Sequence, residues 1–166
     1  MAKARRILIL TQDPVLAELG SEALSGGGHQ VLQVRNLSML PPLLAEHGTD
    51  LVVIDLNLPD KALRGTAELF GAHPETPVLV LGTSSPSIWE EVAPGNPLEV
   101  LIEPPYSVEG VRDTASRLLE KGHFLAGKEL VGSSPAMREL RERILLVAPS
   151  MISTVLLTGE SGSGKD

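Results

Sequence analysis

The sequence has 166 residues, a length that suits one domain with an appendage. It contains no cysteine, which excludes disulfides, thiolate metal sites and cysteine nucleophiles. The net charge of −7 arises in residues 1–106, whereas residues 107–166 are neutral, and neither part has a basic patch of the kind that binds nucleic acid. The start does not match a signal peptide and no apolar run is long enough to cross a bilayer, so we expect a cytoplasmic protein without a membrane partner.

Short apolar runs alternate with stretches of helical pattern along the first three quarters of the chain. The runs predict strands over residues 6–10, 30–34, 51–55, 78–81 and 98–102. The stretches between and after them predict helices over residues 14–24, 37–47, 61–72, 86–92 and 107–121. Such alternation indicates right-handed βαβ crossovers. The expected fold is therefore α/β, a doubly wound five-stranded parallel sheet in the flavodoxin-like order 2-1-3-4-5.

In a sheet of this kind, ligands bind outside the carboxyl ends of the strands, near the point where the strand order reverses. The residues that follow or end the strands are therefore the candidates for a functional site. They are Thr11, Gln12 and Asp13 after the first strand, Asp55 at the end of the third, Gly82 and Thr83 after the fourth, and Glu103 after the fifth.

The segments RILILTQDP, DLVVIDLNLPD, PVLVLGTSS and VLIEPPYS together resemble the receiver domain of bacterial two-component response regulators. The resemblance implies that Asp55 matches the aspartate that accepts a phosphoryl group in that family. The other functional positions of the family depart from its pattern. The acidic pair that holds Mg²⁺ is replaced by Thr11 and Gln12, the Thr or Ser after the fourth strand by Gly82, the Lys after the fifth by Glu103, and the aromatic switch residue by Val100.

These departures predict a degenerate receiver that no longer runs on phosphorylation. Charge and positioning supply nearly all the catalysis of phosphoryl transfer, and a carboxylate at Glu103 would repel a phosphoryl group beside Asp55. We therefore expect no catalytic residue, no metal site and a doubtful role for a sensor kinase. The resemblance also implies a cis bond between Glu103 and Pro104, because the family's Lys–Pro peptide is usually cis.

Three other interpretations stay open at this point. Asp13, Asp55 and Glu103 could form a rearranged cation site, which would make the chain a working phosphoaspartate receiver. The crevice at the strand ends could instead sense a small molecule or a partner protein. Asp55 could also be no more than a solvated carboxylate at the end of a strand.

The last third of the chain has a different pattern. Residues 122–132 are predicted to form a linker, Ser134 and Pro135 to begin a helix over 135–148, and residues 154–158 to form a strand. A strand followed by G-x-x-x-x-G-K is typical of a phosphate-binding loop, in which backbone N–H groups and the lysine contact the phosphates. The loop consists of Gly159, Glu160, Ser161, Gly162, Ser163, Gly164, Lys165 and Asp166.

Residues 129–166 resemble the start of the AAA+ ATPase domain of sigma-54-dependent transcription activators, which carry an acidic residue after the loop lysine, as Asp166 is here. The two resemblances together imply a receiver-like regulatory domain at 1–121, a linker at 122–132 and a truncated ATPase domain at 133–166. They imply a parent protein that uses ATP and Mg²⁺ and acts with sigma-54 RNA polymerase and DNA. The fragment itself is expected to be no enzyme and to hold no cofactor.

The fifth predicted helix carries a heptad-like stripe that suggests a second copy as partner. The first half of the stripe is expected to cover the sheet. The second half is expected to form a two-fold homodimer through which the domain controls assembly of the ATPase. The residues expected at that interface are Leu118, Leu119 and Leu125.

Overall fold

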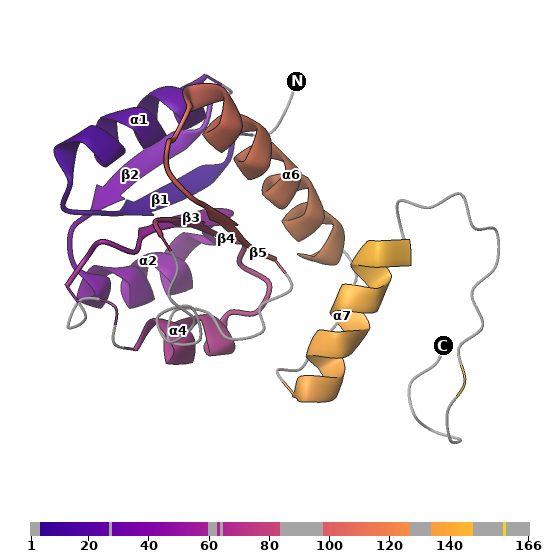
Figure 1. The fold of residues 1–166 in the computed structure, drawn as a ribbon. Coiled ribbons are helices and arrows are strands. Elements are labelled where there is room, and N and C mark those ends of the chain that lie inside the picture. Colours follow the sequence, from indigo (N-terminus) through magenta and orange to yellow (C-terminus); the bar gives the residue numbers. More distant parts are fainter. Residues whose placement is uncertain are drawn as a thin grey trace.

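The computed structural model describes residues 4–26, 28–59, 63, 65–83, 98–126, 134–147 and 158. Within these residues a parallel sheet is covered by helices on both faces (Figure 1). The elements are β1 (Arg6–Leu10), α1 (Pro14–Ser25), β2 (Gln30–Val34), the 3₁₀ turn η1 (Leu37–Met39), α2 (Leu40–His47), β3 (Leu51–Asp55), α4 (Thr66–Ala72), β4 (Val78–Leu81), β5 (Glu99–Ile102), α6 (Val108–Ala126) and α7 (Pro135–Val147).

The sheet has five strands in the order β2-β1-β3-β4-β5, which confirms the predicted fold and topology. Each strand lies within one residue of its predicted bounds, because the apolar runs that form the strands are short and clearly separated. In the register of the sheet, Leu10 pairs with Ile54, Asp55 with Leu81, and Leu81 with Ile102. The carboxyl ends of β1, β3, β4 and β5 therefore meet at one edge of the sheet.

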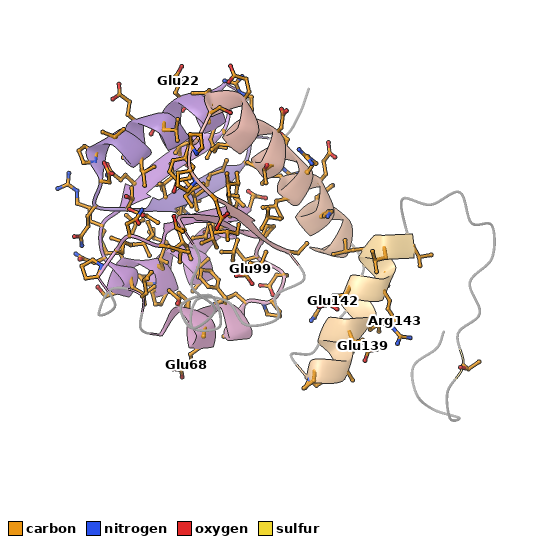
Figure 2. All side chains as sticks on the ribbon, in the orientation of Figure 1. Glu22, Glu68, Glu99, Glu139, Glu142 and Arg143 are labelled. Carbon is orange, nitrogen blue, oxygen red and sulfur yellow. The ribbon has the colours of Figure 1, made fainter. Side chains whose placement is uncertain are left out.

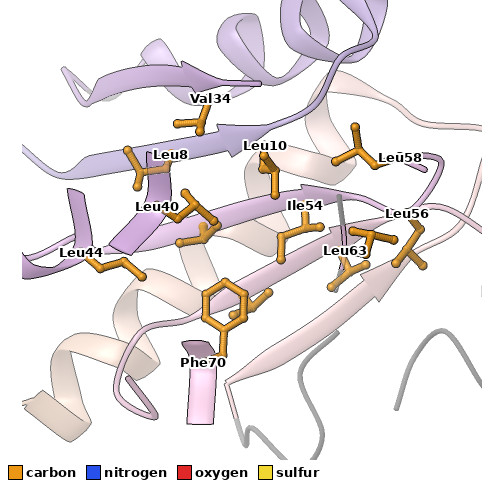
Figure 3. Packing of buried hydrophobic residues seen from close by; sticks show 13 residues of the cluster. Leu8, Leu10, Val34, Leu40, Leu44, Ile54, Leu56, Leu58, Leu63 and Phe70 are labelled. Carbon is orange, nitrogen blue, oxygen red and sulfur yellow. The ribbon is translucent and has the colours of Figure 1, made fainter. Parts of the chain in front are cut away.

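Alternate residues of the strands supply two separate cores. One core packs under α2 and α4 and includes Leu10, Ile54, Leu56, Leu63 and Phe70 (Figure 3). The other packs under α1 and α6 and includes Ile9, Val53, Leu79, Leu81 and Leu118. Because both faces of β3 are covered, all five of its residues are buried, as expected for a central strand of a parallel sheet.

Helix α6 is longer than the sequence pattern suggests, since it continues through the predicted linker start to Ala126. Gly122 lies in this extension and is buried. A Cβ atom placed on Gly122 would be 2.5 Å from Cγ of Pro77, the residue before β4. The missing side chain thus lets the far end of α6 pack directly against the sheet, which explains why the helix does not stop at the glycine.

The same packing corrects the predicted role of two leucines. Leu118 is 1% exposed and Leu119 is 8% exposed, and both belong to the core under α1 and α6. They are already buried within their own chain, so they cannot lie at the axis of a homodimer as expected. The physical reason is that α6 packs against α1 and against β3, β4 and β5. The side chain of Leu125 lies outside the described residues.

Helix α7 begins as predicted. The hydroxyl of Ser134 accepts a hydrogen bond of 3.3 Å from the N–H of Met137, and Pro135 occupies the first helical position. Glu139 and Arg143 form an ion pair one turn apart on its exposed side (Figure 2). The predicted helix over 86–92, the residues 154–157 of the predicted strand and the loop from Gly159 to Asp166 lie outside the described residues. In the described part of the chain, no helix is long and apolar enough to cross a membrane.

Candidate functional site

The candidate site lies where β1, β3 and β4 end side by side. Asp55 is the last residue of β3 and is 4% exposed. Thr11 follows β1 and is also buried, at 1% exposed. Gly82 follows β4 and is held by a hydrogen bond from its N–H to the carbonyl of Ile102, at 3.1 Å. The structure therefore brings together three of the positions that the sequence marks as candidates.

Both oxygens of the Asp55 carboxylate accept hydrogen bonds from the chain itself. The hydroxyl of Thr11 donates to Oδ2 at 2.7 Å, and the N–H of Asn57 donates to Oδ1 at 2.8 Å. The Thr11 hydroxyl in turn accepts a bond of 3.0 Å from the N–H of Asp13. Hydrogen bonds to an ionised carboxylate are stronger than neutral ones, and bonds in series strengthen one another. Asp55 is therefore a satisfied buried carboxylate, which corrects the interpretation of it as a solvated one.

The other two residues after β1 direct their polar atoms elsewhere. Oδ1 of Asp13 accepts a hydrogen bond of 2.8 Å from the N–H of Val15, so this carboxylate caps the N-terminus of α1. The Nε2 group of Gln12 donates to the carbonyl of Arg35 at 3.2 Å. Both residues are exposed. Asp13 thus serves the start of a helix rather than the neighbourhood of Asp55.

Gly82 has a steric reason to be glycine. A Cβ atom at this position would lie 2.5 Å from Cβ and 3.1 Å from Cγ of Leu56, and the backbone φ is +156°. Leu56 is buried, and its N–H donates to the carbonyl of Leu81 at 2.9 Å. The space in which the family's Thr or Ser side chain would begin is therefore filled by Leu56. Thr83, one position later, is exposed.

The residues after β5 differ from the expectation in two respects. Glu103 is exposed, and the cis peptide bond lies between Pro104 and Pro105 rather than between Glu103 and Pro104. Tyr106, in the same loop, lies close enough to Asp55 for the charge of that carboxylate to act on its hydroxyl. Partial burial, and after it the negative charge of Asp55, raise the pKa of the Tyr106 hydroxyl above its usual range.

The fit of Mg²⁺ to this site can be tested from its donor set. Magnesium binds carboxylate and other oxygen ligands in octahedral geometry. Here Asp55 accepts two bonds from the chain, Asp13 caps α1 and Glu103 is exposed. Among the residues that the structure describes, no group of three or more acidic or histidine side chains could hold a metal ion. Among the described residues, Asp13, Asp55 and Glu103 are therefore not gathered into a three-carboxylate cation site.

Sequence reasoning missed two features of the site. Leu56 was not singled out, although it directly follows the central strand β3 and so lies beside the end of β4. Tyr106 was not singled out either, although it follows β5 at the same edge. Val100, the expected position of the switch residue, is a partly buried aliphatic side chain that packs against the core under α6.

Similar proteins cover nearly the whole chain. It is 30% identical to the response regulator protein FleR of Pseudomonas aeruginosa over 98% of its length, and 28% identical to the transcriptional regulatory protein ZraR of Escherichia coli K12 over 96%. It is 26% identical to the DNA-binding transcriptional regulator NtrC of Azospirillum brasilense over 98%. The chain spans 35%, 38% and 36% of the length of these relatives. No family model matches it.

Solved structures share its fold. NtrX from Brucella abortus in complex with ADP covers 89% of this chain with a TM-score of 0.59 and 25% identity, and this match uses 35% of the NtrX chain. The beryllofluoride-activated NtrC4 receiver domain dimer covers 70% of this chain with a TM-score of 0.57 and 19% identity, a match over 98% of that chain. At that identity the second likeness shows the fold alone.

Proposed function

This chain belongs to the response regulators and has their receiver fold. From this premise, we propose that it is a regulatory domain that works without phosphorylation of Asp55. The observation that carries the proposal is the hydrogen bond of 2.7 Å from Thr11 to the Asp55 carboxylate. It puts a neutral donor where phosphoryl transfer needs a metal ligand.

Transfer to Asp55 would need a carboxylate oxygen that is free to attack phosphorus, together with positive charge that neutralises the developing anion. Both oxygens of Asp55 are engaged with Thr11 and Asn57. These bonds stabilise the carboxylate and make its oxygens weaker nucleophiles, and neither donor carries the positive charge that the transfer needs. The neighbouring carboxylate of Asp13 is used to cap α1. The site therefore favours a stable resting carboxylate over a nucleophile.

The parent protein is proposed to be a sigma-54-dependent transcription activator whose AAA+ domain uses ATP and Mg²⁺ and which acts with sigma-54 RNA polymerase on DNA. In support, the relatives are a response regulator and transcriptional regulators. NtrX, a similar structure, was solved with ADP and with ATP. The sequence from Gly159 to Asp166 has the phosphate-loop pattern. The receiver-like domain at 1–121 would control assembly of the ATPase domain that begins after the linker at 122–132.

Control of assembly is proposed to act through a homodimer on α6, and the NtrC4 receiver dimer supports a dimer in this fold. Because Leu118 and Leu119 are buried, the contact would use the exposed face of α6. That face carries charges of both signs, among them Asp113 and Arg117. A two-fold contact can pair such charges with their symmetry mates.

The test of phosphorylation independence is intact-mass measurement of the 166-residue chain after incubation with acetyl phosphate and Mg²⁺. We expect no phosphate adduct on the wild type. The Asp55→Asn variant is the matched control, because it removes the acceptor and keeps its shape. An adduct that forms on the wild type and is missing from Asp55→Asn would overturn the proposal.

A second candidate function, sensing of a small molecule, is favoured by a groove of about 480 Å³ beside the ends of β1 and β2. Its volume lies within the range of small-ligand sites, about 300–1,000 Å³. The lining includes Gln12, Glu18, Gln33 and Arg35. These side chains offer hydrogen-bond donors and acceptors and charges of both signs. A ligand that binds there would raise the melting temperature of the wild type, and Glu18→Gln with Arg35→Gln would abolish that shift.

A further inference from the structure

We infer that the groove between α1 and α6 binds a small organic acid, a molecule with one carboxylate and a short aliphatic tail. The two helices lie side by side on the same face of the sheet (Figure 1). The groove has a volume of about 450 Å³, within the range of small-ligand sites, about 300–1,000 Å³. It is lined by the end of α1, by His29 and by residues between 112 and 119 of α6.

This groove is separate from the edge of the sheet at which Asp55 lies. Asp55 ends β3, whereas His29 stands directly before the first residue of β2. Because the strands are parallel, the groove touches the amino end of its strand and Asp55 lies at the opposite edge. It also shares no lining residue with the groove beside the ends of β1 and β2. The inference therefore goes beyond the proposed function and does not depend on the state of Asp55.

The charged group of the groove is the guanidinium of Arg112. Its Nε donates a hydrogen bond of 3.1 Å to the carbonyl of Ala23, in the last turn of α1. Such a bond by itself only caps the helix, but it uses one of five N–H donors. In the described part of the chain, the two terminal amino groups have no protein acceptor. The bond to α1 thus orients a fork of two free donors, which is the geometry that binds a carboxylate through two parallel hydrogen bonds.

Two neutral polar groups also line the groove. Nδ1 of His29 accepts a hydrogen bond of 3.3 Å from the N–H of Arg5, so the neutral ring carries its proton on Nε2, which is a donor. The hydroxyl of Ser116, an exposed residue, is a further donor. None of the described residues that line the groove is acidic. One positive charge with neutral donors matches a monoanion, whereas a dianion such as phosphate would keep part of its charge uncompensated.

The rest of the lining is apolar and fixed in place. Leu24, Ala115 and Leu119 line the groove, are buried, and belong to the core under α1 and α6. An apolar floor favours an aliphatic tail, because a polar tail would lose its water there without gaining a hydrogen bond. A charged fork beside an apolar floor is therefore the pattern that recognises an aliphatic carboxylate.

The position of the groove gives such a ligand a route to the rest of the chain. A bound carboxylate would join α1 to α6 through Arg112. Helix α6 runs on without a break to Ala126, and the next described helix is α7. Occupation of the groove would thus stabilise the packing of α6 on the domain, as an input signal that needs no phosphorylation.

The experiment is a titration of the nitrogen-15-labelled 166-residue chain with sodium hexanoate, followed by two-dimensional amide NMR at constant ionic strength. Hexanamide is the matched control ligand, because it has nearly the same shape and no charge. We expect hexanoate to shift the amides of residues 23–26 and 112–119 along one saturable curve, with the millimolar affinity of a ligand of few atoms. Hexanamide and inorganic phosphate should each bind about tenfold more weakly, or not at all.

Three variants test the assigned residues. Arg112→Gln should weaken the binding of hexanoate about tenfold. Arg117→Gln is the matched control, since Arg117 is exposed on the same helix, donates to the carbonyl of Asp113 and does not line the groove. It should leave the dissociation constant within about twofold of the wild type. Gly26→Phe should block the groove while Arg112 stays in place, because a Cβ on Gly26 meets no atom within 4 Å and its φ of −63° suits any residue.

Several results would show the inference to be wrong. They are the lack of a saturable shift at these amides, equal or tighter binding of hexanamide or phosphate, and equal effects of the two arginine substitutions. If Arg112→Gln does not fold, Gly26→Phe decides, since unchanged binding in that variant contradicts the site and lost binding supports it. The proposed function fails by a different result, a phosphate adduct on Asp55 of the wild type.

Discussion

The hydroxyl oxygen of Thr11 and Oδ2 of Asp55 lie 2.7 Å apart and join the ends of the two central strands by a buried hydrogen bond. Phosphoryl transfer to Asp55 would need a second carboxylate and a metal ion at this edge of the sheet. Here a neutral hydroxyl serves instead, and it is itself held by the N–H of Asp13. The edge of the sheet has thus become part of the stable framework of the domain.

The first prediction concerns this hydrogen bond. Thr11→Val keeps the shape of the side chain but leaves one oxygen of the buried Asp55 carboxylate without its donor. We expect the free energy of unfolding to fall by about 1.5–3 kcal/mol, as for hydrogen bonds to charged groups. Urea unfolding measures the change. Thr83→Val is the matched control on an exposed threonine and should stay within about 0.5 kcal/mol of the wild type. Equal effects of the two substitutions would contradict the assigned role of Thr11.

The second prediction compares two helical glycines. Gly122→Ala would force Cβ to within 2.5 Å of the Pro77 ring, so we expect a loss of about 1–3 kcal/mol from overpacking despite the better helix propensity of alanine. Gly71→Ala in α4 meets no atom within 4 Å and should be stabilising by about 0.5 kcal/mol. Thermal unfolding measures both. A Gly122→Ala variant that is as stable as the wild type, or more stable, would show that α6 does not pack tightly on Pro77.

The third prediction distinguishes a core residue from an interface residue. Leu118→Ala should lower the free energy of unfolding by about 2–5 kcal/mol, because it removes a fully buried side chain. The loss should be the same at low and high protein concentration, whereas loss of a dimer contact depends on concentration. Leu146→Ala on α7 is the control, since Leu146 is 77% exposed, and it should change little. A loss of stability that grows with protein concentration would show that Leu118 lies at an interface between two copies.

The fourth prediction concerns the pH dependence of stability. Glu99 begins β5, and its Oε1 is buried without a hydrogen-bond partner in the described part of the chain. Burial raises the pKa of this carboxyl from 4.5 to about 8. Between these values the folded state holds a proton that the unfolded state releases, so stability should fall as the pH rises from 4.5 to 8.

Glu99→Gln mimics the protonated carboxyl and should flatten that dependence. At a pH above 8 the variant should be more stable than the wild type by about 1–2 kcal/mol, a figure reduced because the side chain is partly exposed and water screens it. Melting temperatures across the pH range provide the measurement. Glu68→Gln is the control, since Glu68 is exposed on α4 and projects away from it (Figure 2). A wild type whose stability rises over this range would contradict the assignment.

Much of the fold could be predicted from the sequence because its signals are local. The apolar run of β3 is buried at all five positions, as the unbroken pattern indicates. The helix at α7 begins at Pro135 after the capping Ser134, which is also a local signal. The end of α6 was predicted too early, because Gly122 reads as a helix terminator unless its contact with Pro77 is known.

The candidate site could be predicted only in part. The sequence by itself determined that Asp55 ends a central strand and that Thr11 and Gly82 stand at neighbouring strand ends, since strand order and length place these positions together. It could not determine that Thr11 donates to Asp55, that Asp13 turns to cap α1, or that Leu56 fills the space beside Gly82. Those contacts depend on the register between strands and on rotamers chosen by packing, and both are properties of the assembled sheet rather than of any local segment. For the same reason, the heptad-like stripe of α6 was compatible either with a dimer interface or with a core. Only the position of the helix over the sheet decided that Leu118 and Leu119 belong to the core.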